Sequence, residues 1–370
     1  MKGNVSFPLI MEDHMRKQLN LIQVSRALVP LFVLLFHANE MMDFYFDYNF
    51  LGISVGTKSG GVYYFFALSG FMMYYIYHTK IGNKGIIKDF LYSRFIRIFP
   101  VYWILTLLIL PIYFIIPGFG DGNEREFSTI MTSLLLIPRE NEPILGVAWS
   151  LIHTVYFYLL FSLVLFKNSK ISMAIIFIWS LLSVAFSLKI LSSSHYLLNF
   201  FFNFNNLIFL SGVACAYCVS KIRIPSAISI FFIIVGFSGF PLSWVNAELS
   251  FINLGLQMIT TLSSVFLILG LSSIDLRKEI TIPSFAKYLG ESSLSIYLTH
   301  KLTLSLLCKT ISIISFIAIN NKVLSIFIIV ISILVGCFVY SFIEKPLNHK
   351  LKELKMKREN KFTQPEILKV

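Results

Sequence analysis

Long apolar stretches alternate with short polar segments along almost the whole chain. A bilayer core about 30 Å thick needs about 20 mostly apolar residues for each helical span. By this measure we expect about ten spans, at residues 20–41, 58–78, 98–117, 146–166, 171–189, 197–219, 226–245, 252–273, 293–317 and 323–343. Because no long polar block separates them, the pattern predicts one all-α, polytopic membrane domain over residues 1–348, followed by a basic tail at 349–370.

Lysine and arginine are distributed unevenly among the connecting segments. If the N-terminus is cytoplasmic, most of them fall in the inside segments, and the tail after Glu344 alone holds eight. The outside segments hold only Lys58, Arg125, Arg139, Lys189 and Lys322. Cytoplasmic connections of membrane proteins carry an excess of Lys and Arg. The bias therefore predicts that both termini are cytoplasmic and that the long polar loop at 118–145 is external.

The composition agrees with a membrane protein, since 56% of the residues are hydrophobic and 14% are charged, against about 25% charged in soluble domains. The net charge of +12 is then mostly a topology signal, and we expect the tail to lie against anionic lipid headgroups. No aromatic or glycine pattern accompanies the basic residues, so we expect no nucleic-acid partner. The C-x-x-C of Cys215 and Cys218 has no second pair, so we expect no metal.

Arg26 and His37 are the leading candidates for chemistry, because ionisable groups inside a membrane are costly and usually functional. Eleven residues bring a helix back to nearly the same direction, so both side chains are predicted on one face, about 16 Å apart along the axis. His37 lies toward the outer end of its span and Arg26 toward the inner end. A structural pair satisfied by backbone carbonyls or a neighbouring carboxylate is the alternative.

Two further features follow along the chain. In GGVYYFFALSGF (60–71), the glycines permit close helix approach or a local break. Arg94 and Arg97, at i and i+3, are neighbours on one helical face at the predicted cytoplasmic surface, just before Pro100 opens the next span. Two adjacent guanidinium groups there suit a phosphate-bearing ligand. An anchor that contacts lipid phosphates is the alternative.

Four more ionisable residues lie in apolar segments. They are His153, His300, Lys301 and, in FIEKPL, Glu344. A lone membrane histidine is more often a hydrogen-bonded packing residue than a catalytic one, and Glu344 is expected to form a structural pair with Lys345 or a basic inside segment. We therefore treat His153, His300 and Glu344 as secondary site candidates.

Taken together, these segments resemble acyltransferase family 3, the membrane O-acyltransferases that modify bacterial cell-surface glycans. Arg26 and His37 are similar to the family's Arg-x10-His, GGVYYFFALSGF to its glycine-aromatic segment, and SRFIRIFPVYW to its Arg-x-x-Arg-hydrophobic-x-Pro motif. AWSLIHTVYFY, IYLTH and FIEKPL resemble its later landmarks in order, over residues 18–348. The family often has a carboxylate three residues after Trp-Ser-Leu, where this chain has Thr154 beside His153.

The resemblance implies an enzyme of the bacterial inner membrane that transfers an acyl group, usually acetyl, from cytoplasmic acyl-CoA. The acceptor would be a hydroxyl of a cell-surface or lipid-linked glycan, such as O-antigen, capsule or exopolysaccharide. Acetyl-CoA or another acyl-CoA would be a donor substrate, with no permanently bound cofactor. His37 would act as the base, Arg26 on the same helix face would hold the donor or a neighbouring helix, and Arg94 and Arg97 would bind the CoA phosphates.

Two other functions fit a bundle with buried polar groups. A transporter of a lipid-linked sugar or small solute predicts internal repeats, and the two halves of the chain contain no convincing repeat. An assembly subunit of a polysaccharide export system would not require Arg26 and His37 on one face. The sequence leaves open which glycan, hydroxyl and acyl chain are involved, and whether transfer is direct or through an acyl-enzyme.

Overall fold

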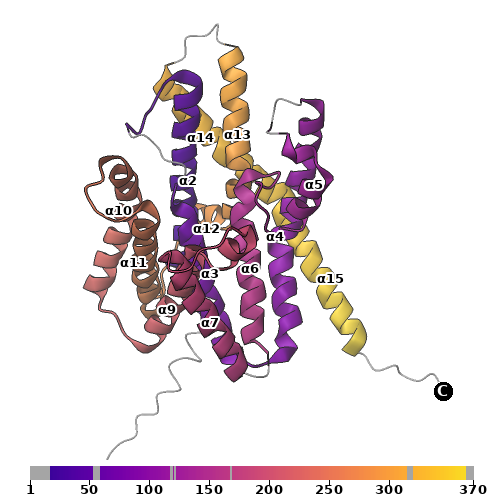
Figure 1. The fold of residues 1–370 in the computed structure, drawn as a ribbon, viewed down its shortest axis with the longest axis vertical. Coiled ribbons are helices and arrows are strands. Elements are labelled where there is room, and N and C mark those ends of the chain that lie inside the picture. Colours follow the sequence, from indigo (N-terminus) through magenta and orange to yellow (C-terminus); the bar gives the residue numbers. More distant parts are fainter. Residues whose placement is uncertain are drawn as a thin grey trace, which may run out of the picture.

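The computed structural model describes residues 17–52, 59–116, 120, 122–166, 169–314 and 320–363. Ten long helices form the bundle: α2 (Asn20–Phe46), α3 (Gly61–Tyr77), α4 (Ile87–Ile115), α6 (Trp149–Val164), α7 (Ser169–Ser187), α9 (Phe204–Lys221), α10 (Ser226–Leu249), α11 (Leu256–Arg277), α13 (Ser293–Ile313) and α14 (Asn321–Val339). Shorter or peripheral helices are α5 (Phe127–Leu134), α8 (Tyr196–Phe201), α12 (Ser284–Glu291) and α15 (Lys345–Thr363). Figure 1 shows their arrangement.

Each predicted span coincides with one of the ten long helices, although the outermost residues predicted at 58, 117 and 315–317 lie outside the described residues. In the described part of the chain, eight stretches are long and apolar enough to cross a bilayer. The other two predicted spans are α3, with 17 residues, and α13, which contains Lys301 and Lys309. The all-α, polytopic membrane fold is confirmed, whereas the number of crossings and the side of the termini stay predictions.

The structure differs from the sequence prediction at two connections. Helix α4 begins at Ile87, eleven residues before the predicted start of its span at 98, so Arg94 and Arg97 lie in the same continuous helix as that span. The charged residues before the apolar run are part of the helix, and two of them, Arg94 and Arg97, line a cavity. The loop at 118–145, which has no helical signal in its sequence, contains the amphipathic helix α5.

Close approach between backbones holds α3 against α9. A Cβ atom at Gly70 would lie 2.0 Å from the carbonyl oxygen of Phe209, and one at Gly212 would lie 1.7 Å from that of Ala67. Either substitution would push the two helices apart, so both positions require glycine. Small residues allow such contacts in membranes, where the hydrophobic effect does not hold helices together. The contact fixes α3, which forms one wall of the cavity described below.

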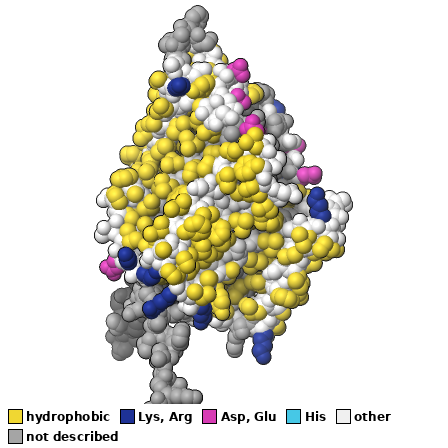
Figure 2. Space-filling model, turned by 90° about the vertical axis from the view of Figure 1, so that its left-hand side faces the viewer, with side chains coloured by type: hydrophobic (Ala, Val, Ile, Leu, Met, Phe, Trp, Pro, Cys, Tyr) yellow, Lys and Arg dark blue, Asp and Glu magenta, His cyan; other side chains and the backbone are white. Residues whose placement is uncertain are grey.

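Apolar side chains cover the outside of the bundle. Figure 2 shows a broad band of hydrophobic side chains across one face, with Lys and Arg gathered near its lower edge. Exposed members of this kind include Leu108 on α4 (64%), Phe177 on α7 (63%) and Phe231 on α10 (60%). An apolar surface of this extent marks contact with lipid.

Helix α15 continues from α14 through a π-helical turn, η6 (Tyr340–Glu344), so the predicted domain boundary after residue 348 falls inside a helix. Its first half is tied to the start of α4. The Tyr92 hydroxyl donates to the carbonyl oxygen of Leu351 (3.0 Å), and the Lys355 ammonium lies 2.6 Å from the Asp89 carboxylate.

Candidate functional site

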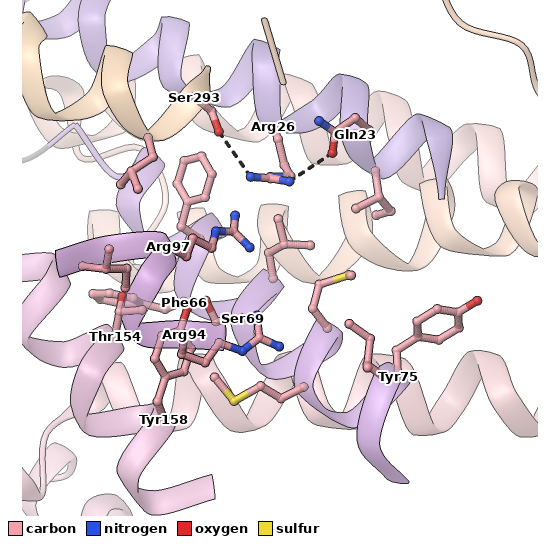
Figure 3. Close-up of a pocket in the computed structure, with 18 of the residues that line it drawn as sticks. Gln23, Arg26, Phe66, Ser69, Tyr75, Arg94, Arg97, Thr154, Tyr158 and Ser293 are labelled. Atoms are coloured by element: carbon pink, nitrogen blue, oxygen red, sulfur yellow. Dashed lines mark hydrogen bonds between the residues drawn. The ribbon is translucent and has the colours of Figure 1, made fainter. Parts of the chain in front are cut away.

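An inner cavity of about 380 Å³ lies between α2, α3, α4, α6 and α13. Arg26 from α2 and Arg94 and Arg97 from α4 all line it, and Figure 3 shows their guanidinium groups around one space, with Ser69 and Tyr158 nearby. Permanent cations with planar donor arrays are suited to phosphate groups. The sequence placed Arg94 beside Arg97, and the fold adds Arg26 from a different helix.

Arg26 is held by two neighbours. One terminal nitrogen donates to the Gln23 side-chain oxygen on the same helix (3.0 Å), and the other to the Ser293 hydroxyl on α13 (3.5 Å). Pro30, four residues later in α2, has no amide hydrogen to offer the Arg26 carbonyl oxygen. The guanidinium group is therefore positioned at the cavity wall from two helices, while the backbone beside it lacks one helical hydrogen bond.

Arg94 lies in a box of aromatic rings. Its guanidinium carbon is 5.8 Å from the ring centre of Tyr77, 5.4 Å from that of Phe90 and 5.4 Å from that of Tyr158. Cation–π contacts of this kind stabilise a charge that has lost water. The rings fix the direction of Arg94 without neutralising it.

Glu344 is buried (5% exposed) and accepts a hydrogen bond from the Ser295 hydroxyl on α13 (2.5 Å). It interacts electrostatically with Arg97 and Arg26. Arg97 belongs to one of the basic inside segments that were expected as partners, whereas Arg26 lies in the first span and was not. Glu344 is the last residue of a π-helical turn, and such turns are frequent at functional sites. One buried carboxylate thus interacts with two of the three arginines that line the cavity.

His37 lies further along α2 and does not line the inner cavity. Its Nδ1 donates to the Glu40 carboxylate at 2.6 Å, three residues later. A histidine that donates from Nδ1 to a carboxylate keeps Nε2 available to accept a proton. Glu40 was not among the sequence candidates, although its spacing of three residues from His37 was a readable signal.

His300 comes within 5.3 Å of His37, measured between ring centres. It is 1% exposed, and its Nδ1 donates to the carbonyl oxygen of Tyr297 (2.6 Å). Its Nε2 has no hydrogen-bond partner among the residues that the structure describes. The fold therefore brings two imidazoles and a carboxylate together, from α2 and α13, which the sequence did not predict as a group.

Tyr297 separates this histidine pair from the arginines. Its hydroxyl donates to the carbonyl oxygen of Val147 and lies 2.8 Å from the Ser150 hydroxyl, at the start of α6. Tyr297 and Ser150 line the inner cavity, which therefore ends about one turn of α13 before His300. The hydrogen-bonded contact of Tyr297 with Val147 and Ser150, here called the Tyr297 septum, therefore lies between the arginines and the histidine pair.

His153 occupies a different place. Its Nε2 lies 3.2 Å from the side-chain nitrogen of Asn205, whose oxygen accepts from Gln257 (3.0 Å), and its ring stacks on Phe200 at 4.3 Å. These contacts join α6, α9 and α11. His153 does not line the inner cavity, whereas Thr154, at the position of the family carboxylate, does. The contacts of His153 are those of a packing residue.

The fold and the site are those of an integral membrane protein with an internal polar site. This site consists of a cavity lined by three arginines and a separate histidine–carboxylate pair. The acyltransferase domain family matches residues 20–342 of this chain. The chain belongs to that family, and it is an O-acyltransferase that uses an acyl donor.

A relative agrees with this assignment. The chain is 24% identical over 286 residues to the exopolysaccharide production protein ExoZ of Rhizobium meliloti, covering 75% of this chain and 83% of that protein. No solved structure matches the chain. Family membership favours an enzyme over the transporter and assembly-subunit alternatives.

Proposed function

We propose that this protein transfers an acyl group, most simply acetyl, from cytoplasmic acyl-CoA to a hydroxyl of a cell-surface or lipid-linked glycan in the bacterial inner membrane. The observation that carries the proposal is the pairing of the three-arginine cavity with the His37–Glu40 pair on one helix of an acyltransferase fold. The arginines suit a phosphate-rich donor, and the imidazole suits activation of a hydroxyl.

The donor end is the inner cavity. Arg94 and Arg97 bind the phosphates of CoA, with Arg94 oriented by its aromatic box and Arg97 by the field of Glu344. Arg26 then lies between the phosphate sites and His37, about 16 Å from His37 along an ideal helix. The pantetheine arm runs along α2 from the arginines, and the acyl group reaches His37 past Tyr297.

The chemical step takes place at His37. Nε2 accepts the proton of the acceptor hydroxyl as its oxygen attacks the thioester carbonyl carbon. The carbon–oxygen ester bond forms, the carbon–sulfur bond breaks, and His37 returns the proton to the leaving thiolate, which gives free CoA. Glu40 accepts a hydrogen bond from Nδ1 throughout, so it orients the ring and stabilises the imidazolium. Direct transfer needs no acyl-enzyme.

The relative and the predicted topology support a polysaccharide as the acceptor. ExoZ is named for exopolysaccharide production, and His37 lies toward the end of α2 predicted to face outward. We take an extracytoplasmic or lipid-linked polysaccharide as the acceptor, and lipid headgroups as the neighbours of the basic tail.

Membranes carrying the protein test the proposal with radiolabelled acetyl-CoA and alkali-de-O-acylated polysaccharide from the producing cells. Removal of a general base typically lowers the rate by about 10²- to 10⁴-fold. We expect a loss of this size in His37→Ala and almost as much in His37→Gln, which keeps the shape but not the basicity. His195→Gln, an exposed histidine before α8, is the matched control. Near-normal transfer by His37→Gln at normal membrane abundance would refute the proposal.

A further inference from the structure

A second cavity, of about 520 Å³, lies on the other side of the Tyr297 septum. It is bounded by the outer ends of α2 and α13 and by the segment that leads into α6. Met41 and Tyr45, one and two turns beyond His37, line one side, and Lys301, next to His300, lines another. Val147, whose carbonyl oxygen accepts from Tyr297, also lines it. Neither His37 nor His300 lines this outer cavity, but residues close to them along α2 and α13 do, and no arginine does.

The segment that forms its wall is rigidly held. The Ile144 amide donates to the Ser133 hydroxyl (3.1 Å), and the Tyr113 hydroxyl donates to the Ile144 carbonyl oxygen (3.1 Å). Ile144 is 2% exposed, so the segment is anchored by its apolar side chain. Asn141 and Glu142, just before it, are left on the cavity side. The fold therefore presents these two polar side chains on a fixed backbone.

Polar groups without partners converge on the outer cavity. The side chains of Asn141, Glu142, Lys301 and Ser305 make no hydrogen bond or ion pair within the described parts of the chain, and those of Glu142 and Lys301 are exposed. They supply an amide, a carboxylate, an ammonium and a hydroxyl, which together donate and accept hydrogen bonds in several directions. A pocket with a few convergent polar groups orients a polar ligand. Sugar hydroxyls both donate and accept, so they match this mixed lining.

The charges around the outer cavity balance. Two glutamates, Glu124 and Glu142, and two lysines, Lys301 and Lys309, line it. The inner cavity, in contrast, holds three arginines and suits polyanions. A balanced lining gives no net attraction for a phosphate or carboxylate, so it favours an uncharged, hydroxyl-rich group.

We propose that the outer cavity binds an uncharged sugar residue of the acceptor glycan and presents its hydroxyl to His37. Glu142 and Asn141 accept and donate hydrogen bonds to the sugar hydroxyls, Lys301 donates from α13, and Tyr45 offers an aromatic face. This inference rests on the proposed function, since it places the acceptor of that reaction. Glu142 and Lys301 determine acceptor affinity and take no part in proton transfer.

Kinetics with two varied substrates test the proposal, using alkali-de-O-acylated polysaccharide from the producing cells as acceptor and acetyl-CoA as donor. Hydrogen bonds to charged groups contribute enough that their loss weakens binding by about tenfold or more. We expect Glu142→Gln and Lys301→Met each to raise the KM for polysaccharide by about tenfold, with kcat and the KM for acetyl-CoA nearly unchanged. Glu140→Gln, two residues from Glu142 and outside the cavity lining, is the matched control.

The outcomes separate this inference from the proposed function. If Glu142→Gln and Lys301→Met behave like Glu140→Gln while His37→Ala is inactive, the outer cavity is not the acceptor site and the proposed function stands. If the two variants raise the KM for acetyl-CoA instead, the cavity belongs to the donor and the inference is wrong. If His37→Ala retains activity, the proposed function itself fails, whatever the outer-cavity variants do.

Discussion

The inner and outer cavities lie on opposite sides of one tyrosine, and their linings differ in kind. The inner cavity combines three arginines with aromatic and apolar walls, whereas the outer cavity combines carboxylates, ammonium groups and amides without net charge. Fixed cations in an apolar surround hold a polyanion and position it. A mixed polar lining instead selects by the directions of hydrogen bonds. On the proposed function, one enzyme handles two chemically unlike substrates by keeping their sites apart, with His37 near the boundary.

The largest effect that tests this division is expected at Glu40. Glu40→Gln removes the charge that orients and stabilises His37 but leaves both cavities unchanged. We expect kcat to fall by about 100-fold, less than the about 10⁴-fold loss when a buried triad carboxylate is replaced, because the Glu40 side chain is 28% exposed. Both KM values should stay near normal. Glu248→Gln, on α10, is the control. An unchanged kcat in Glu40→Gln would show that Glu40 does not contribute to catalysis.

A smaller effect, confined to the donor, is expected at Arg97. Arg97→Lys replaces a planar, bidentate donor by a point charge, so the KM for acetyl-CoA should rise by about tenfold while the KM for polysaccharide does not change. Arg223→Lys, between α9 and α10 and outside the inner cavity, is the matched control. An unchanged donor KM in the Arg94→Ala, Arg97→Ala double variant would assign this pair to lipid anchoring.

The effect expected at Asn205 is on stability alone. Asn205→Leu removes the partner that links His153 to Gln257, and an unpaired buried polar group costs about 1–3 kcal/mol. The thermal unfolding midpoint in detergent should fall while the KM values and kcat change by less than about twofold. A fall in kcat at normal stability would instead make His153 part of the site.

A qualitative test concerns the sides on which the two cavities open. Reporter proteins inserted at Gly120 and fused after residue 370 should report opposite faces of the membrane, with Gly120 outside, because Lys and Arg gather on the other side. The same face for both reporters would overturn the predicted topology. It would also place both cavities' openings in the wrong compartments for the proposed substrates.

Much of the fold could be predicted from the sequence, because each membrane helix corresponds to a long apolar run. Arg94 and Arg97 were paired correctly because i and i+3 is a local relation. The approach of Arg26 to them, and of His37 to His300, depends on how α2 packs against α4 and α13, which no local pattern records. The early start of α4 was missed because charged residues that face a cavity resemble residues in a loop. Helix α5 was missed because it is short and lies in a polar segment.

The ties between α15 and α4 have a mechanical consequence. Tyr92 and Asp89, which bond to Leu351 and Lys355, lie within about two turns of Arg94 on the same helix. The tail therefore holds the first turns of α4, next to the inner cavity, in addition to presenting a basic surface. A chain that stops at Asn348 would keep every predicted span yet lose both ties, and the first turns of α4 would be released. The length of chain kept beyond the last span thus sets how stiffly the arginine helix is held.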